Sequence, residues 1–107
     1  MSSFMRLFVM FNLPVRTASE RKEAARFRKF LLNDGYYMLQ YSIYVRICSG
    51  MEAADKHEQR LKNNLPEHGS VRLLRITERQ YTAMRILCGN PSPDLDIDHE
   101  KTTILTL

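Results

Sequence analysis

The chain has 107 residues, the length of a single domain, and 44% of them are hydrophobic, which is enough for one core. The net charge of +4 is uneven: residues 1–90 carry 15 Lys and Arg against eight Asp and Glu, whereas residues 91–107 carry one Lys against four acidic residues. No run approaches the roughly 18 apolar residues that a membrane span requires, and a basic body favours a polyanion as partner, with ordinary solubilising charge as the alternative.

Residues 4–12 (FMRLFVMFN) are apolar at nearly every position, and Pro14 follows them. Because Arg6 interrupts the run and no small-residue cleavage site follows, we interpret it as a strand rather than a signal peptide and expect a cytoplasmic protein. Apolar side chains in both alternating sets predict a strand that is buried on both faces of a sheet.

The next segment carries strong helix signals. Thr17–Glu20 (TASE) is a capping box, and Asp34-Gly35 supplies a stop with a glycine for a left-handed cap. The apolar residues between these signals recur at three- and four-residue spacing and so share one helix face: Ala24, Phe27, Phe30 and Leu31.

Residues 36–48 (YYMLQYSIYVRIC) are rich in aromatic and β-branched side chains, which predicts extended chain. Gln40 or Ser42 marks a bulge or a reversal into a second strand. A second capping box, Ser49–Glu52, predicts a helix that ends before Pro66.

The remaining chain predicts a strand at residues 71–76 and, from the capping box TERQ, a short helical turn over residues 77–84. We expect one more short strand at residues 86–88. A Pro- and Gly-rich linker follows at residues 89–93, and residues 102–107 (TTILTL) are typical of a strand that adds to a sheet edge of this chain, a second copy or another partner.

The order β-α-β-β-α-β with an extra C-terminal strand predicts the α+β class and a ferredoxin-like sandwich, an antiparallel sheet with two helices on one face. Residues 1–90 form this domain, and residues 91–107 form an acidic linker and a C-terminal β-strand tail. Since the other sheet face is also apolar, we expect a second copy to cover it in a face-to-face homodimer.

Basic residues of the first helix, and one just before it, are the nucleic-acid candidates: Arg16, Arg21, Lys22, Arg26, Arg28 and Lys29. At 100° per residue, Arg21 and Arg28 share one flank, whereas Lys22, Arg26 and Lys29 form the opposite, outward side. Such a ridge neutralises phosphates with an affinity that falls as salt rises, and Arg16 adds a contact near the helix N-terminus. A solvated helix face is the alternative.

The sequence contains few signals for RNA stacking, catalysis or metal binding. The tyrosines at 36, 37, 41 and 44 are either stacking platforms for RNA or packing residues, and the missing Gly-aromatic signature of RNA-recognition strands favours packing. We find no paired carboxylates, no Gly-rich phosphate loop and no Cys/His spacing typical of zinc, so a self-sufficient enzyme is disfavoured.

Four segments together resemble one family: MRLFVMFNLP (5–14), ERKEAARFRKFLLNDG (20–35), YYMLQYSIYVRI (36–47) and LLRITERQYTAM (73–84). Over these residues the chain is similar to CRISPR-associated protein 2, the small dimeric subunit of the spacer-acquisition integrase in antiviral defence, in the versions found beside type II effectors. The resemblance implies a homodimer that bridges two dimers of CRISPR-associated protein 1 and contacts the backbone of a double-stranded protospacer. It also implies a C-terminal tail that docks the integrase subunit.

The resemblance further implies an aspartate at the end of the first strand, where two copies hold magnesium for phosphodiester cleavage. Asn12 occupies that position here. Because magnesium prefers carboxylate oxygens and an amide is neutral, Mg²⁺ binding is weakened, and we assign no catalytic residue. We therefore expect a non-catalytic DNA-bridging subunit that needs no cofactor.

Two other readings compete with this one. The first is a magnesium-dependent endonuclease of the same family, acting on RNA or DNA. The second is a ligand-sensing domain of ferredoxin-like fold, which lacks its expected Gly-rich loop in this sequence.

Overall fold

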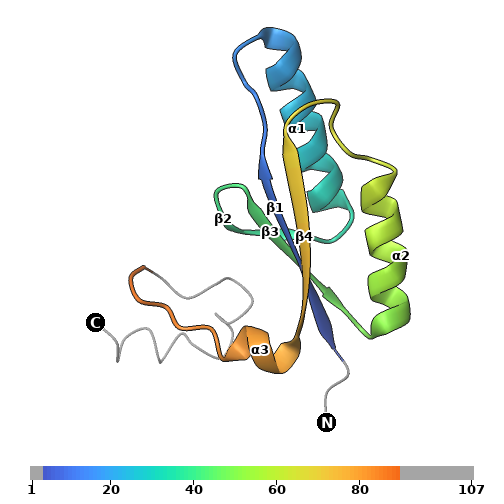
Figure 1. The fold of residues 1–107 in the computed structure, drawn as a ribbon, viewed down its shortest axis with the longest axis vertical. Coiled ribbons are helices and arrows are strands. Elements are labelled where there is room, and N and C mark those ends of the chain that lie inside the picture. Colours follow the sequence, from blue (N-terminus) through green and yellow to red (C-terminus); the bar gives the residue numbers. More distant parts are fainter. Residues whose placement is uncertain (1–3, 90–107) are drawn as a thin grey trace.

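The structure, a computed structural model, describes residues 4–89 (Figure 1). In chain order the elements are β1 (Met5–Asn12), α1 (Ala18–Asn33), β2 (Tyr37–Gln40), β3 (Ile43–Cys48), α2 (Met51–Lys62), β4 (Ser70–Thr77) and α3 (Glu78–Thr82). The strands form one antiparallel sheet in the order β2-β3-β1-β4. This βαββαβ arrangement is ferredoxin-like, which confirms the predicted fold class.

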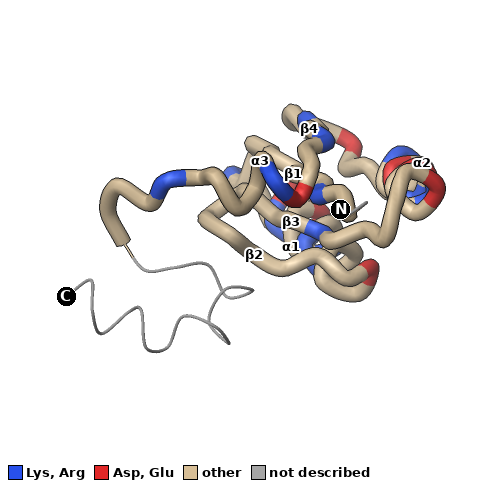
Figure 2. The backbone as a smooth tube through the Cα atoms, turned by 90° about the horizontal axis from the view of Figure 1, so that it is seen from below, with Lys and Arg blue, Asp and Glu red and all other residues tan. Residues whose placement is uncertain are grey.

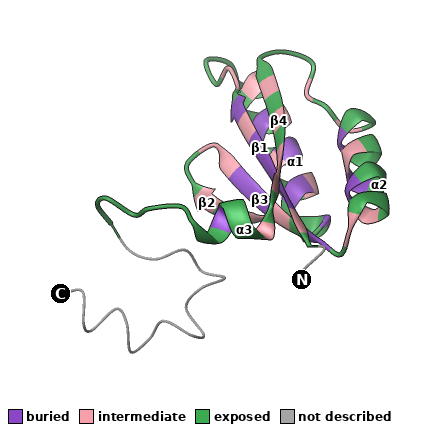
Figure 3. Cartoon of the chain, turned by 60° about the horizontal axis from the view of Figure 1, so that its bottom comes forward, coloured by how far each residue is buried: buried purple, intermediate pink, exposed green. Residues whose placement is uncertain are grey.

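The central strand β1 is buried on both faces, as its apolar run predicted. Figure 3 shows that most of β1 is buried. Leu7, Val9 and Phe11 belong to the main core, and Phe8 packs in a second cluster with Tyr81 of α3. The helix residues of the main core come from α1 and α2: Ala24, Phe27, Leu31, Ala54 and Leu61. Thus α1 and α2 cover one sheet face, and α3 covers part of the other.

Two of the three predicted capping boxes are confirmed. Thr17 Oγ1 accepts the Glu20 backbone N–H at 3.0 Å while Glu20 Oε1 accepts the Thr17 N–H, and Thr77 caps α3 in the same way. The prediction at Ser49 is wrong, because α2 begins one residue later with Gly50 as its N-cap and no side-chain cap. The third helical position is then an alanine, which has no carboxylate to return the bond.

The 36–48 segment divides into a hairpin. Ser42 adopts a left-handed backbone with φ of 65° at the reversal, and the β2–β3 register shifts between Met38 and Gln40. The backbone N–H of Phe11 donates to the Ser42 carbonyl at 3.0 Å, so the hairpin tip is held against β1. Both features that the sequence offered as alternatives are present.

The end of the described chain differs from the prediction. The helix α3 ends at Thr82 rather than near Met84, and residues 86–88 form no strand. Ile86 and Leu87 are 48% and 91% exposed, and among residues 4–89 no strand pairs with them after the chain leaves the sheet through α3. The predicted linker beyond Gly89 and the strand at 102–107 lie outside the described residues.

Within residues 4–89 no helix is long and apolar enough to cross a bilayer.

A buried arginine attaches α3 to the sheet. Arg6 is 4% exposed, and its guanidinium forms a two-bond ion pair with Glu78, with Nε–Oε1 at 2.5 Å and Nη2–Oε2 at 2.6 Å. Nη1 donates to the Tyr37 hydroxyl at 2.9 Å, and the guanidinium lies 4.0 Å from the ring centroid of Tyr81. Glu78 and Tyr81 of α3 and Tyr37 of β2 therefore compensate one buried charge on β1.

A second buried cluster joins the end of α1 to α2. Asp34 is 6% exposed and accepts from Arg60 Nε at 2.6 Å, while its other carboxylate oxygen lies 3.0 Å from Nδ1 of His57. Because both partners come from α2, the cluster fixes the two helices relative to each other.

Candidate nucleic-acid interface

The outward side of α1 presents two lysines to solvent. Lys22 and Lys29 are exposed, and neither has an ion-pair or hydrogen-bond partner within residues 4–89. They are seven residues apart, so they lie on one line along the helix about 10 Å apart. Two unpaired ammonium groups on one line of a rigid helix are available to a polyanion.

The three arginines of α1 already bond within the chain. Arg21 Nη1 donates to the carbonyls of residues 15 and 16 at 3.1 Å, which closes the loop before the helix. Arg28 is half-buried, with its guanidinium 5.8 Å from the ring centroid of Phe11. These contacts fix the two guanidinium groups without neutralising them, so their charge still adds to the surface.

Arg26 links α1 to the loop after α2. Its Nη2 donates to Glu23 Oε1 at 2.8 Å and to the carbonyls of Asn64 and Leu65 at 3.2 Å. The hydrogen bonds from this guanidinium hold the pKa of Glu23 below its ordinary range. Of the predicted candidates, Arg26 therefore makes the most hydrogen bonds within the protein, and its charge is paired with Glu23.

Figure 2 shows basic residues on several elements rather than on α1 alone. On β4, Arg72 is exposed, whereas Arg75 pairs with Asp55 and Glu58 of α2 at 2.7 and 2.9 Å. Arg79 and Arg85, on and after α3, are exposed as well. Sequence reasoning did not include Arg72, Arg79 or Arg85 among the candidates, because it followed the charge pattern of the first helix.

The last residue of β1 lies at the rim of an open hollow. Asn12 is exposed and pairs in register with Ser70 of β4. The hollow has a volume of about 520 Å³, and Arg16, Glu20 and Gly69 line it with Asn12. It thus joins the end of β1, the start of α1 and the loop before β4.

Gly69 is required for this close approach. Its φ is 99°, and a Cβ atom there would lie 2.6 Å from the Asn12 carbonyl oxygen. We expect Gly69→Ala to lower the free energy of unfolding by about 1–3 kcal/mol through backbone strain and to displace the end of β1. Urea unfolding measures this loss. Gly89→Ala is the control, because Gly89 has a similar φ but open space around it. Equal losses of stability in the two variants would mean that the positive φ, and not the contact with Asn12, causes the whole effect.

The hollow does not fit the magnesium ion that the family resemblance implies. Asn12 offers a neutral amide, and Arg16 brings a positive charge to the same rim. One carboxylate, Glu20, is present, and its Oε1 accepts the backbone N–H groups of Arg16 and Thr17 at 2.9 and 3.0 Å. Within residues 4–89 no three His, Cys, Asp or Glu side chains are placed to hold a metal ion.

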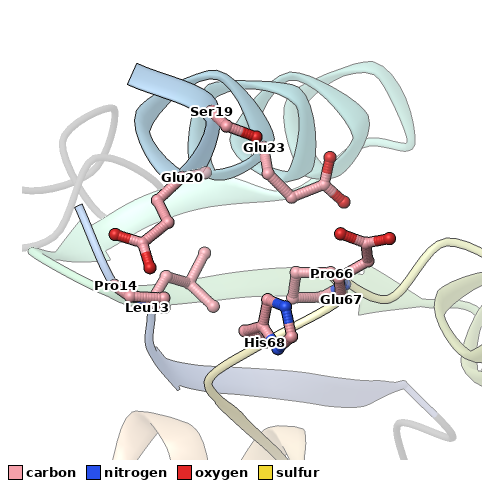
Figure 4. Close-up of a pocket in the computed structure, with 9 residues that line it drawn as sticks. Leu13, Pro14, Ser19, Glu20, Glu23, Pro66, Glu67 and His68 are labelled. Atoms are coloured by element: carbon pink, nitrogen blue, oxygen red, sulfur yellow. The ribbon is translucent and has the colours of Figure 1, made fainter. Parts of the chain in front are cut away.

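A small cavity adjoins the hollow beneath the start of α1 (Figure 4). Its volume is about 30 Å³, room for a water molecule, and Glu20, Glu23, Glu67 and His68 are among its lining residues. Figure 4 shows the carboxylates of Glu23 and Glu67 turned toward each other. Glu20 caps the helix and Glu23 binds Arg26, so local structure accounts for these two carboxylates.

The tyrosines confirm the packing interpretation with one exception. Tyr36 and Tyr44 are buried, and Tyr37 bonds to Arg6 and to the Tyr81 hydroxyl. Burial raises the pKa of Tyr36 above its ordinary range, and its hydroxyl has no hydrogen-bond partner among the described residues. Tyr41, at the hairpin tip, is 90% exposed and is the one that presents its ring to solvent.

Comparisons with known proteins agree on one family. The family model described as CRISPR associated protein Cas2 matches residues 5–84. A protein of Acidovorax ebreus is 53% identical over 87 residues, which cover 81% of this chain and 85% of that protein. A protein of Ligilactobacillus salivarius is 45% identical over 101 residues, covering 94% and 100%, and one of Streptococcus mutans is 42% identical over 85 residues, covering 79% and 78%. All three carry the name CRISPR-associated endoribonuclease Cas2.

Proposed function

The chain belongs to the CRISPR-associated protein Cas2 family, and we propose that it is the DNA-bridging subunit of spacer acquisition and does not itself cut nucleic acid. It binds the phosphate backbone of a double-stranded protospacer in the cytoplasm. Sequence-independent contacts suit this task, because foreign DNA of any sequence is a substrate for capture.

The observation that carries the proposal is the pair of unpartnered lysines on α1. Lys22 and Lys29 project from a rigid helix, about 10 Å apart along one line. Arg16, which precedes the helix, adds another exposed positive charge. Point charges of this kind bind phosphate and carry no information about base sequence.

The proposal includes a homodimer formed through the part of the sheet face that α3 leaves uncovered among residues 4–89. On that face Leu74 and Ile47 are 51% and 40% exposed, beside the second core cluster around Phe8. Covering an apolar face with a second copy removes this area from water and doubles the number of phosphate contacts. The dimer bridges two dimers of CRISPR-associated protein 1, with residues 91–107 as the docking tail.

A second candidate function is favoured by the relatives, which are named endoribonucleases. A metal-dependent nuclease needs carboxylate ligands for its cation, and the end of β1 supplies an amide instead. For this reason we propose DNA bridging as the main function and nucleic-acid cleavage as the second candidate. DNA bridging by this chain requires no Mg²⁺.

The test is sedimentation of the purified protein with a labelled duplex over a series of salt concentrations, without divalent cations. We expect a dimer that binds the duplex, with an affinity that falls steeply as salt rises and is the same for unrelated sequences. The endoribonuclease would be favoured instead if the protein were a monomer that does not bind duplex DNA and if it cleaved single-stranded RNA in the presence of magnesium.

A further inference from the structure

The hollow at the end of β1 is lined by hydrogen-bond donors where the family resemblance implies metal ligands. The Asn12 side chain is exposed and has no hydrogen-bond partner within residues 4–89, and the same is true of the Arg16 guanidinium. A guanidinium only donates hydrogen bonds, and an amide NH₂ group donates two. Both side chains are therefore available to a ligand that accepts hydrogen bonds.

The charge of the hollow is compatible with an anion. Glu20 is the one carboxylate among its lining residues, and this side chain already accepts two backbone N–H groups at the start of α1. Asn12 adds no charge, so the Arg16 cation and the Glu20 carboxylate leave the lining neutral, and the two donors of Asn12 and Arg16 are not opposed by a net negative charge. An aspartate at position 12 would instead leave the hollow with a net negative charge, which attracts cations and repels phosphates.

We propose that this hollow binds a phosphodiester of nucleic acid, with the Asn12 amide and the Arg16 guanidinium donating to its oxygens. The inference rests on the proposed function, because it makes the hollow one more contact with the same DNA backbone. It lies at the N-terminal end of α1, on the helix that carries Lys22 and Lys29, so one ligand strand engages both. The end of β1 thus serves binding in this chain where the resemblance implies metal chemistry.

The test compares duplex binding by the parent protein, Asn12→Asp, Asn12→Ala and Arg16→Ala in EDTA. Asn12→Asp should weaken binding about tenfold, since a carboxylate about 4 Å from a phosphate repels it by an amount of that order in water. Asn12→Ala should lose only a few-fold, and Arg16→Ala should lower the slope of log affinity against log salt by about one. Magnesium at constant ionic strength should restore Asn12→Asp and leave the parent unchanged.

Gln59→Glu is the matched control, because it adds the same charge at an exposed position on α2. If Gln59→Glu and Asn12→Asp lost the same amount of duplex affinity, overall charge would explain the effect, and the hollow would not be a binding site. Tight binding that requires magnesium in the parent would overturn it as well, in favour of the metal.

A second measurement separates this inference from the proposed function. Inorganic phosphate is titrated into the labelled protein while NMR follows the Asn12 side-chain amide and the Arg16 Nε–H. Shifts of both signals without any duplex binding would sink the proposed function and keep the hollow as an anion site. Duplex binding with both signals unmoved by either ligand would keep the function and discard the hollow.

Discussion

Replacing Lys22 and Lys29 together by glutamate should weaken duplex binding by roughly 100-fold or more at moderate salt. Each replacement removes one phosphate contact and adds one repelling charge on the same line of α1. The slope of log affinity against log salt should fall by about 0.9 for each lost contact. Both side chains are exposed and unpartnered among the described residues, so the fold should be unaffected, and circular dichroism checks this.

The matched control reverses two lysines of α2, Lys56 and Lys62, which are also exposed. This variant has the same net charge as the first, so the comparison isolates position from total charge. Lys62 lies 3.5 Å from Glu58 at the surface, a pair with little effect on stability. If the two double variants bound DNA equally well, α1 would be an ordinary solvated helix and the interface would have to be sought elsewhere.

Replacing Glu78 by alanine should lower the free energy of unfolding by about 3–5 kcal/mol. The change leaves Arg6, which is 4% exposed, without the carboxylate that receives two of its hydrogen bonds. It also releases α3 from the sheet, because Glu78 begins that helix. Urea unfolding followed by circular dichroism measures the loss.

Arg6→Met in the Glu78→Ala background distinguishes a stranded charge from lost packing. Removing the charge as well should recover much of the stability, since replacing both members of a buried ion pair by apolar groups is often neutral. Glu52→Ala, an exposed acidic residue in the first turn of α2, should cost far less. A Glu78→Ala loss no larger than that of Glu52→Ala would mean that water reaches Arg6.

Local signals in the sequence were sufficient for most of the fold. The Thr17 and Thr77 caps, the two-sided burial of β1 and the reversal near Ser42 depend on neighbouring residues, and each of them is present. The predictions that were wrong concerned features that depend on contacts between distant parts of the chain or on the exact start of a helix. The predicted capping box at Ser49 is absent because α2 begins at the next residue, with Gly50 as its N-cap. The apolar run at 86–88 pairs with no strand among the described residues.

The features of the candidate interface were likewise predictable from the sequence where they are local, and not where they depend on distant segments. Helical periodicity placed Lys22 and Lys29 on one outward line, because that geometry is local to a single helix. Nothing near Arg26 in the sequence indicated its bonds to the carbonyls of Asn64 and Leu65, which the turn after α2 brings to it. The hollow likewise depends on Gly69, whose approach to the end of β1 is a contact between distant segments.

The most direct test of a DNA-bridging subunit without catalysis is an integration assay with the integrase subunit, CRISPR-associated protein 1, and a protospacer duplex. Both proteins are kept above their dissociation constants for DNA, and the parent chain is compared with Asn12→Asp and with no added chain. We predict equal integration with Asn12 and with aspartate at that position, and none without the chain. Integration that appears only with aspartate at position 12 would contradict this account, because the end of β1 would then have to supply chemistry.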